Sequence, residues 1–141
     1  MRVTTPVGIA IDLRPDWCDI TDDLDDENVP FTLAREEGYG ALQFSIATYK
    51  AGPLPDASTD TLLKFLQEFE QSRELGPAAD VCTETHPLRL AAGSFHTQSF
   101  IRVWYLSDGR NFAFVTFTCN PAHAAEELRD CEQMVRTISF L

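Results

Sequence analysis

The sequence predicts an α+β fold: an antiparallel β-sheet of about six strands packed with two helices, in an arrangement like an α/β/α sandwich. Three observations support this. Segments with apolar residues at alternate positions flank a segment with helical spacing, and a second helical segment follows the last strands. Both groups of strands are joined locally, which favours antiparallel pairing. At 141 residues and without a dividing linker, the chain is expected to form one domain over residues 1–141.

The first group contains three predicted strands. Residues 7–13 place Val7, Ile9, Ile11 and Leu13 on one face, and the proline at position 15 ends this strand. Residues 31–35 and 41–49 alternate in the same way around a Gly-Tyr-Gly turn. The order is therefore three strands, one helix, three strands and one helix.

The middle helix is predicted between about residues 58 and 75. Ser58 or Thr59 is a good N-cap, and the Gly76-Pro77 pair is a stop signal. Residues 81–90 contain Pro87, so they are predicted to form an edge strand or an extended segment.

A β-hairpin follows, with strands at residues 99–106 and 111–119. The Asp108-Gly109 pair suits a two-residue type I′ turn. That loop would place Trp104 opposite Ala113 and Phe100 opposite Phe117.

Asn120 and Pro121 then open the last helix, with an N-cap and a proline at the first helical position. Residues 138–141 are predicted to add a final strand.

The net charge is −11, from 22 acidic and 11 basic residues. Such a field repels nucleic acids and anionic membrane surfaces, so neither is expected as a partner. Two interpretations remain: the charge keeps the molecules apart in solution, or it attracts a basic protein.

Neither the first residues nor any later segment has the apolar run of a signal peptide or a membrane span. A cytoplasmic location is therefore expected. Cys18, Cys82, Cys119 and Cys131 are widely spaced, which indicates reduced and buried thiols, although four cysteines also permit two disulfides.

No recognisable catalytic, metal or nucleotide motif is present. Cys82 and His86 could begin a metal site, but no second pair has ligand spacing. Cys119 would need His96 nearby in space to act as a nucleophile. We therefore expect no enzymatic activity, no metal and no cofactor.

The most distinctive segment is acidic: seven carboxylates fall within residues 16–27, without one Lys or Arg. The spacing of a calcium loop is absent. This segment is either a solvated loop or a surface that pairs with a basic partner. The hairpin aromatics form a second candidate surface, with Arg102 among them. The predicted partner-binding residues are Trp17, Asp19, Asp22, Asp23, Asp25, Asp26, Glu27, Arg102, Trp104 and Tyr105.

Several features together resemble one superfamily. They are the first strand ending in Pro15-x-Trp17, the strand Ala-Leu-Gln-Phe-Ser-Ile at 41–46, the lone middle helix, the hairpin at 95–119 and the Ile-Ser-Phe ending. The superfamily comprises PsbP proteins, Mog-type Ran-binding factors and the Eag-type chaperones of type VI secretion effectors. The resemblance spans residues 7–141 and implies a single PsbP-like domain.

The resemblance also implies a binding role. Eag-type chaperones hold apolar transmembrane segments of toxins in an exposed groove, and small acidic domains of this type are similar to immunity proteins that block a toxin. The leading hypothesis is a non-enzymatic bacterial immunity protein that occludes a cognate toxin with a basic surface. The alternatives are an Eag-like chaperone for a secreted effector and a small hydrolase with a cryptic site. Whether the protein forms a homodimer is left open.

Overall fold

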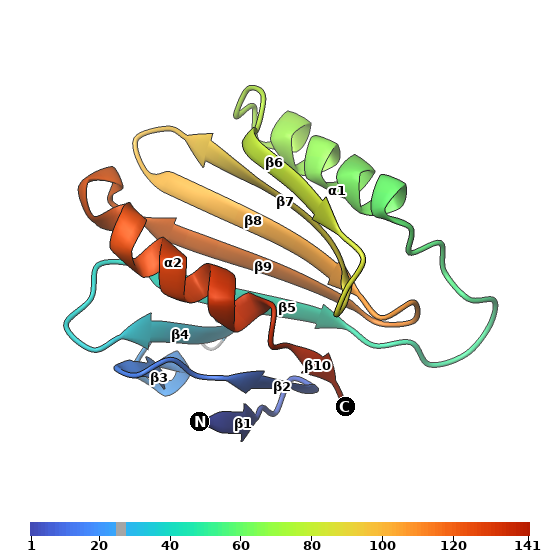
Figure 1. Cartoon of the computed structure of the whole chain (residues 1–141), viewed down its shortest axis with the longest axis horizontal. Helices are drawn as coiled ribbons and strands as arrows, with labels where there is room; N and C mark the ends of the chain where they lie inside the picture. Colours follow the sequence, from blue (N-terminus) through green and yellow to red (C-terminus); the bar gives the residue numbers. More distant parts are fainter. Residues whose placement is uncertain (25–27) are drawn as a thin grey trace.

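The structure is a computed structural model that describes residues 1–24 and 28–141. Within these residues, strands with alternating apolar side chains form a seven-stranded antiparallel sheet at the centre. The strand order is β3-β4-β5-β9-β8-β7-β6 (Figure 1). The strands are β3 (Trp17–Asp19), β4 (Phe31–Arg35), β5 (Ala41–Ala47), β6 (Ala79–Glu84), β7 (Arg89–His96), β8 (Phe100–Ser107) and β9 (Phe112–Cys119). With two helices beside it, this sheet confirms the predicted α+β class.

A second, three-stranded sheet brings the chain ends together. It consists of β1 (Arg2–Thr4), β2 (Ile9–Asp12) and β10 (Ser139–Phe140), in the order β1-β2-β10. Figure 1 shows both termini at this small sheet. The predicted strand at residues 7–13 is thus shorter than expected and pairs outside the main sheet.

The two α-helices pack on opposite faces of the large sheet. Leu66 and Phe69 of α1 (Thr59–Ser72) join one core cluster with Val103, whereas Met134 of α2 (Ala124–Val135) joins the other with Trp104. Because neighbouring residues on a strand point to opposite faces, the two helices must lie on opposite sides of β8. Figure 1 shows α2 crossing in front of the sheet.

Local signals explain where α1 begins and ends. The Ser58 side chain accepts a hydrogen bond from the backbone N–H of Thr61 at 3.2 Å, so Ser58 rather than Thr59 is the N-cap. After the helix, Gly76 adopts a φ of +78°, a conformation that favours glycine.

The segment at 81–90 differs from its prediction because it belongs to two strands. β6 is an edge strand, as expected, but it ends at Glu84, and Pro87 lies in the connection to β7. β7 begins at Arg89 and pairs with both β6 and β8.

The predicted hairpin register is also wrong. Trp104 pairs with Val115 and Phe100 pairs with Cys119, so the register is shifted by two residues. A type I′ turn needs positive φ at both central residues, but of the Asp108-Gly109 pair only Gly109 has it. The Asp108 carboxylate instead accepts the backbone N–H groups of residues 110 and 111 at 2.9 and 2.8 Å, which stabilises a four-residue loop.

Candidate functional site: an acidic sheet edge and an apolar groove

Strand β3 forms one edge of the large sheet, and exposed carboxylates lie on it and at both of its ends. Its pairing with β4 places Trp17 opposite Arg35 and Asp19 opposite Leu33. The 3₁₀ turn η1 (Thr21–Asp23) follows β3. The side chain of Thr21 accepts a hydrogen bond from the backbone N–H of Thr32 at 2.9 Å, which ties the turn to β4. Six exposed carboxylates lie along β3 and at its two ends, and we call them the acidic edge: Asp16, Asp19, Asp22, Asp23, Glu36 and Glu37. Of the other predicted acidic residues, Asp25, Asp26 and Glu27 lie outside the described residues.

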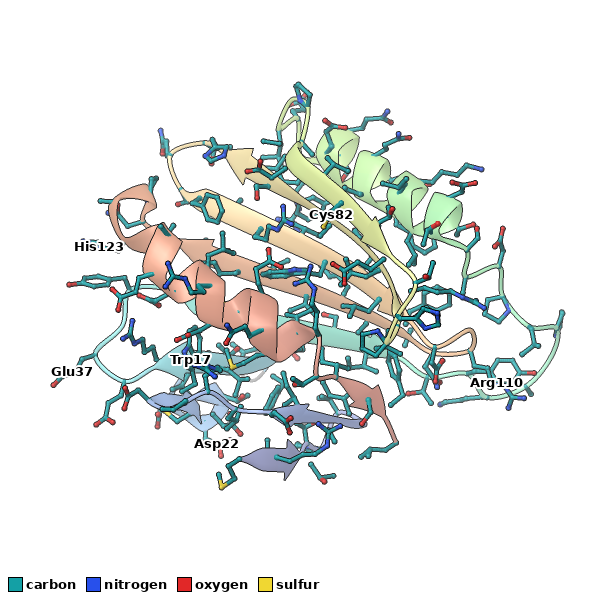
Figure 2. The ribbon with its side chains drawn as sticks, in the orientation of Figure 1. Trp17, Asp22, Glu37, Cys82, Arg110 and His123 are labelled. Atoms are coloured by element: carbon teal, nitrogen blue, oxygen red, sulfur yellow. The ribbon has the colours of Figure 1, made fainter. Side chains whose placement is uncertain are left out.

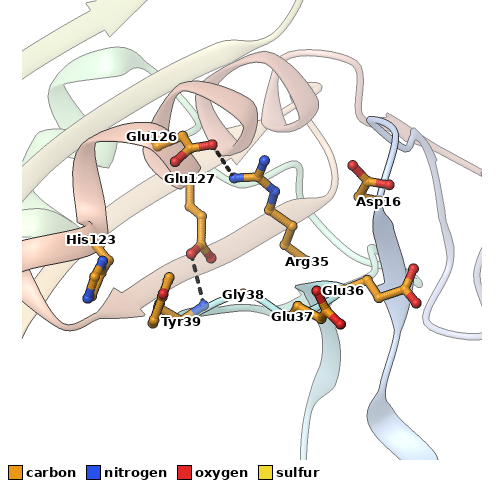
Figure 3. Close-up of a pocket in the computed structure, with 9 residues that line it drawn as sticks. All are labelled: Asp16, Arg35, Glu36, Glu37, Gly38, Tyr39, His123, Glu126 and Glu127. Atoms are coloured by element: carbon orange, nitrogen blue, oxygen red, sulfur yellow. Dashed lines mark hydrogen bonds and ion pairs between the residues drawn. The ribbon is translucent and has the colours of Figure 1, made fainter.

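An open cavity of about 470 Å³ lies at one end of the acidic edge, between the turn after β4 and the start of α2 (Figure 3). Arg35 pairs with Glu126 across it, with 2.7 Å between Nη1 and Oε1. This hydrogen bond raises the pKa of Arg35 above its ordinary value. Five carboxylates make the lining of the cavity strongly acidic. The lining residues are Asp16, Arg35, Glu36, Glu37, Gly38, Tyr39, His123, Glu126 and Glu127.

Glu127 fixes the shape of this cavity. Its side chain is buried, and its two carboxylate oxygens accept the backbone N–H groups of Tyr39 at 2.9 Å and Gly40 at 3.1 Å. A Cβ atom at Gly40 would lie 2.5 Å from the ring of Phe117, so only glycine lets the chain pass there. The glycines therefore form a turn, as predicted, and a carboxylate from α2 holds it.

Tyr39 and His123 form an aromatic stack on the rim of the cavity. Their ring centroids are 3.7 Å apart and their planes differ by 7°. Tyr39 is 62% exposed, so the stack presents a large aromatic surface beside the carboxylates (Figure 3). Neither residue was among the predicted contact residues, because the local signal in the sequence is no more than a tyrosine between two glycines, directly after Glu36 and Glu37.

Trp17, Arg102 and Trp104 require a correction, because their side chains are buried and do not form a contact surface. The indole N–H of Trp17, a residue labelled near α2 in Figure 2, donates to Asp130 of that helix at 2.8 Å. Arg102 donates to Glu132 at 2.9 Å, and Trp104 donates to the same carboxylate at 3.1 Å. All three bind α2 to the sheet because their side chains point to the face that this helix covers.

Tyr105, the remaining predicted contact residue, points to the opposite face and lines a groove beside α1. Its ring packs 4.9 Å from Phe114 and 5.8 Å from Phe65, measured between centroids. Burial raises the pKa of its hydroxyl to about 12. We call this space of about 380 Å³ the apolar groove; it is lined by Ser45, Ile46, Ala47, Phe65, Tyr105, Phe112, Ala113 and Phe114.

The proposed nucleophile pair is not assembled. His96 and Cys119 both pair with Phe100, from opposite sides, so two strand spacings, about 10 Å, separate them. Burial also raises the pKa of Cys119, which opposes formation of a reactive thiolate. All four cysteines, which lie in the described part of the chain, are free.

Two further features concern metals and membranes. Within residues 1–24 and 28–141, no three His, Cys, Asp or Glu side chains are grouped so that they could hold a metal ion. In the same part of the chain, each helix is too short or too polar to cross a membrane.

Comparison with models of protein families and with curated proteins gives no match. Solved structures do match. A crystal structure from Bacteroides thetaiotaomicron VPI-5482 has a TM-score of 0.66 and 14% identity over 99% of this chain, which spans only 48% of that protein. The solution structure of cyanobacterial PsbP (CyanoP) from Synechocystis sp. PCC 6803 has a TM-score of 0.61 and 8% identity, over 100% of this chain and 92% of CyanoP. The order of strands and helices described above is therefore that of a PsbP-like α+β fold.

Proposed function

We propose that the protein is a non-enzymatic binding domain whose acidic edge contacts a basic surface of a partner protein. The observation that carries this proposal is the alignment of six exposed carboxylates along the β3 edge with the exposed stack of Tyr39 and His123 at one end. Charges of this kind speed association with an oppositely charged partner, and an exposed tyrosine is a typical anchor residue of interfaces.

The charge of the acidic edge is poorly compensated. Beside it, within the described residues, Arg14 pairs with Asp130 at 3.7 Å and Arg35 pairs with Glu126 at 2.7 Å. Both arginines thus interact with carboxylates of α2 rather than with the edge. Because the whole chain carries −11, its field adds to that of the edge and favours a cationic partner.

The surface is also held in one shape. Glu127 fixes the turn that carries Glu36 and Glu37, and the contact with His123 restrains the ring of Tyr39. A pre-organised surface loses less conformational entropy when it binds. This supports tight occlusion of a partner, as an immunity protein requires.

Most concretely, we propose a cytoplasmic immunity protein that covers the basic cleft of a cognate toxin. The cytoplasm keeps thiols reduced, which agrees with the four free cysteines. The carboxylates would face the cationic groups of the toxin, while Tyr39 packs against its surface.

The proposal is tested by capturing the partner from a lysate of the source cells and measuring its association rate with purified variants. Asp22→Lys/Asp23→Lys and Glu36→Lys/Glu37→Lys reverse charge on the edge, and Glu68→Lys/Glu74→Lys makes the same change at α1. We expect the edge variants to associate at least about tenfold more slowly than wild type, and the α1 variant to stay within about twofold. Equal effects of the three variants would show that only net charge matters and would refute a contact at the edge.

Toxin neutralisation has its own test. Expression of the captured partner should stop growth of a host cell, and co-expression of the wild-type protein should restore it. If the partner binds the edge but does not inhibit growth, the binding role stands and the immunity role is wrong.

The apolar groove favours a second candidate, an Eag-like chaperone for a secreted effector. Such a chaperone needs exposed apolar area for a transmembrane segment, and the half-buried rings of Phe65, Phe112 and Phe114 supply it. This candidate predicts that the captured partner carries an apolar segment and that Phe112→Asp abolishes binding while the edge variants bind normally.

A further inference from the structure

A second, more polar cavity of about 190 Å³ adjoins the apolar groove. The two share Ser45 and Phe114 as lining residues, and we call them together the channel along α1. The remaining lining residues of the polar end are Pro30, Gln43, Phe69, Arg73, Ile101, Thr116 and Thr118. Cavities of about 300–1,000 Å³ with apolar walls and a few polar groups are typical of small-molecule sites.

The polarity of the channel changes in the same direction along both strands of its floor. On β9 the residues facing α1 are two phenylalanines, at 112 and 114, followed by two threonines, at 116 and 118. Their partners on β5 follow the same trend: Ala47 pairs with Phe112, Ser45 with Phe114 and Gln43 with Thr116. The floor is therefore apolar at one end and rich in hydroxyl and amide groups at the other.

Arg73 supplies a cation at the polar end. It is the one charged residue among the described residues that line the channel, and its guanidinium carbon lies 4.7 Å from the ring centroid of Phe69. None of the ion pairs formed between described residues includes Arg73. A guanidinium has the geometry to bind a carboxylate through two hydrogen bonds.

We infer that this channel binds an amphiphile with an extended apolar chain and one carboxylate head. The chain lies against Phe65, Phe112 and Phe114, and the head pairs with Arg73 near Gln43 and Thr116. Among the described lining residues the one charge is positive, and it favours an anionic head over a cationic one. This site shares no residue with the acidic edge, so it is independent of the proposed contact at that edge; the chaperone candidate would occupy the same groove.

The test is titration of the protein with dodecanoate below its micelle concentration, followed by calorimetry and by backbone amide NMR shifts. Dodecan-1-ol, which lacks the charge, and acetate, which lacks the chain, are the comparison ligands. Arg73→Gln removes the head contact, and Lys64→Gln removes a charge elsewhere on α1 as its matched control. Ser45→Trp fills the channel from an exposed position, so that it blocks the site without altering the core.

We expect saturable 1:1 binding of dodecanoate, weaker binding of dodecan-1-ol and none of acetate, with shifts confined to the lining residues and their neighbours on α1, β5, β8 and β9. Arg73→Gln should weaken dodecanoate binding about tenfold, the value of one charge-assisted contact, and should leave dodecan-1-ol binding unchanged. Lys64→Gln should behave as wild type, and Ser45→Trp should bind neither ligand.

Several results would overturn the inference. They are the absence of saturable dodecanoate binding by the wild type, equal effects of Arg73→Gln and Lys64→Gln, and shifts outside the channel. Binding of an apolar helical peptide in place of dodecanoate would identify a protein-binding groove and would also refute the assignment. Failure of any of these measurements leaves the acidic-edge proposal untouched, because neither probe nor variants contact that edge.

Discussion

The ring of Tyr39 stacks on the imidazole of His123 with 3.7 Å between their centroids. This contact joins the turn after β4 to the start of α2, two segments that are distant in the sequence. Together with the hydrogen bonds from the turn to Glu127, it sets the shape of the acidic cavity.

Replacement of Tyr39 by alanine should weaken partner binding without unfolding the protein. The side chain is 62% exposed, so its loss should change the free energy of unfolding by less than about 1 kcal/mol. Loss of an aromatic anchor should raise the partner's dissociation rate about tenfold or more, measured by surface plasmon resonance. Tyr39→Phe keeps the ring and should behave as wild type; an unchanged rate for Tyr39→Ala would exclude this residue from the contact.

Truncation of Arg102 should destabilise the fold strongly. The guanidinium is almost fully buried and pairs with Glu132 at 2.9 Å. Glu132 keeps Arg136 as a second partner, but the Asp80 carbonyl and the Ser94 hydroxyl lose the donor that they share, and each buried polar group left without its donor costs about 1–3 kcal/mol. Urea unfolding of Arg102→Met measures this loss. Arg14→Met is the matched control, because the more exposed pair with Asp130 should contribute at most about 1 kcal/mol. Similar losses for the two variants would contradict a buried role for Arg102.

The pair of Glu84 and Arg136 should make stability depend on acid pH. Hydrogen bonds from Arg136, the shortest at 2.6 Å, hold the pKa of Glu84 below its ordinary value of 4.5. A lowered folded-state pKa adds stability above the unfolded-state value, and this stability is lost as pH falls through the folded-state value. The difference in unfolding free energy between wild type and Glu84→Gln should therefore shrink from about pH 6 to about pH 3. A difference that stays constant over this range would show that the ion pair does not contribute.

The cysteines should differ sharply in reactivity. Cys18 is exposed, whereas burial raises the pKa of Cys119 and Cys131, which suppresses the reactive thiolate. A thiol-specific reagent should label Cys18 rapidly, and should label the two buried thiols only as the protein unfolds. The variant Cys18→Ser/Cys82→Ser should lose all rapid labelling; a rapid phase that survives would mean that the interior opens readily.

The sequence predicted elements whose signals are local. The helix that begins after Ser58 and the strand at 31–35 were correct, because capping and alternation act within a few residues. β7 was missed because its central Ala-Ala-Gly-Ser stretch has weak strand propensity. Gly93 is favoured there by tertiary packing, since a Cβ atom would lie 3.0 Å from the side chains of Leu66 and Ala78.

The candidate site was predicted only in part, for a similar reason. Composition alone identified the carboxylates from Asp16 to Asp23, and the structure shows them exposed. It could not reveal that Tyr39 meets His123, because that contact depends on the docking of α2. Arg102 and Trp104 are buried because they lie on the same face of β8 as Phe100 and Leu106. These four residues occupy every second position, so their common face could have been predicted from the sequence.

The central claim is that an acidic edge steers a basic partner, and the dependence of the association rate on ionic strength tests it most directly. Electrostatic steering weakens as salt screens the charges, with a screening length of about 8 Å at physiological ionic strength. The wild type should therefore associate with its partner many times more slowly in high salt than in low salt. Asp22→Lys/Asp23→Lys should flatten or invert this slope. A wild-type rate that is independent of salt, or a slope that the edge variants leave unchanged, would contradict the account.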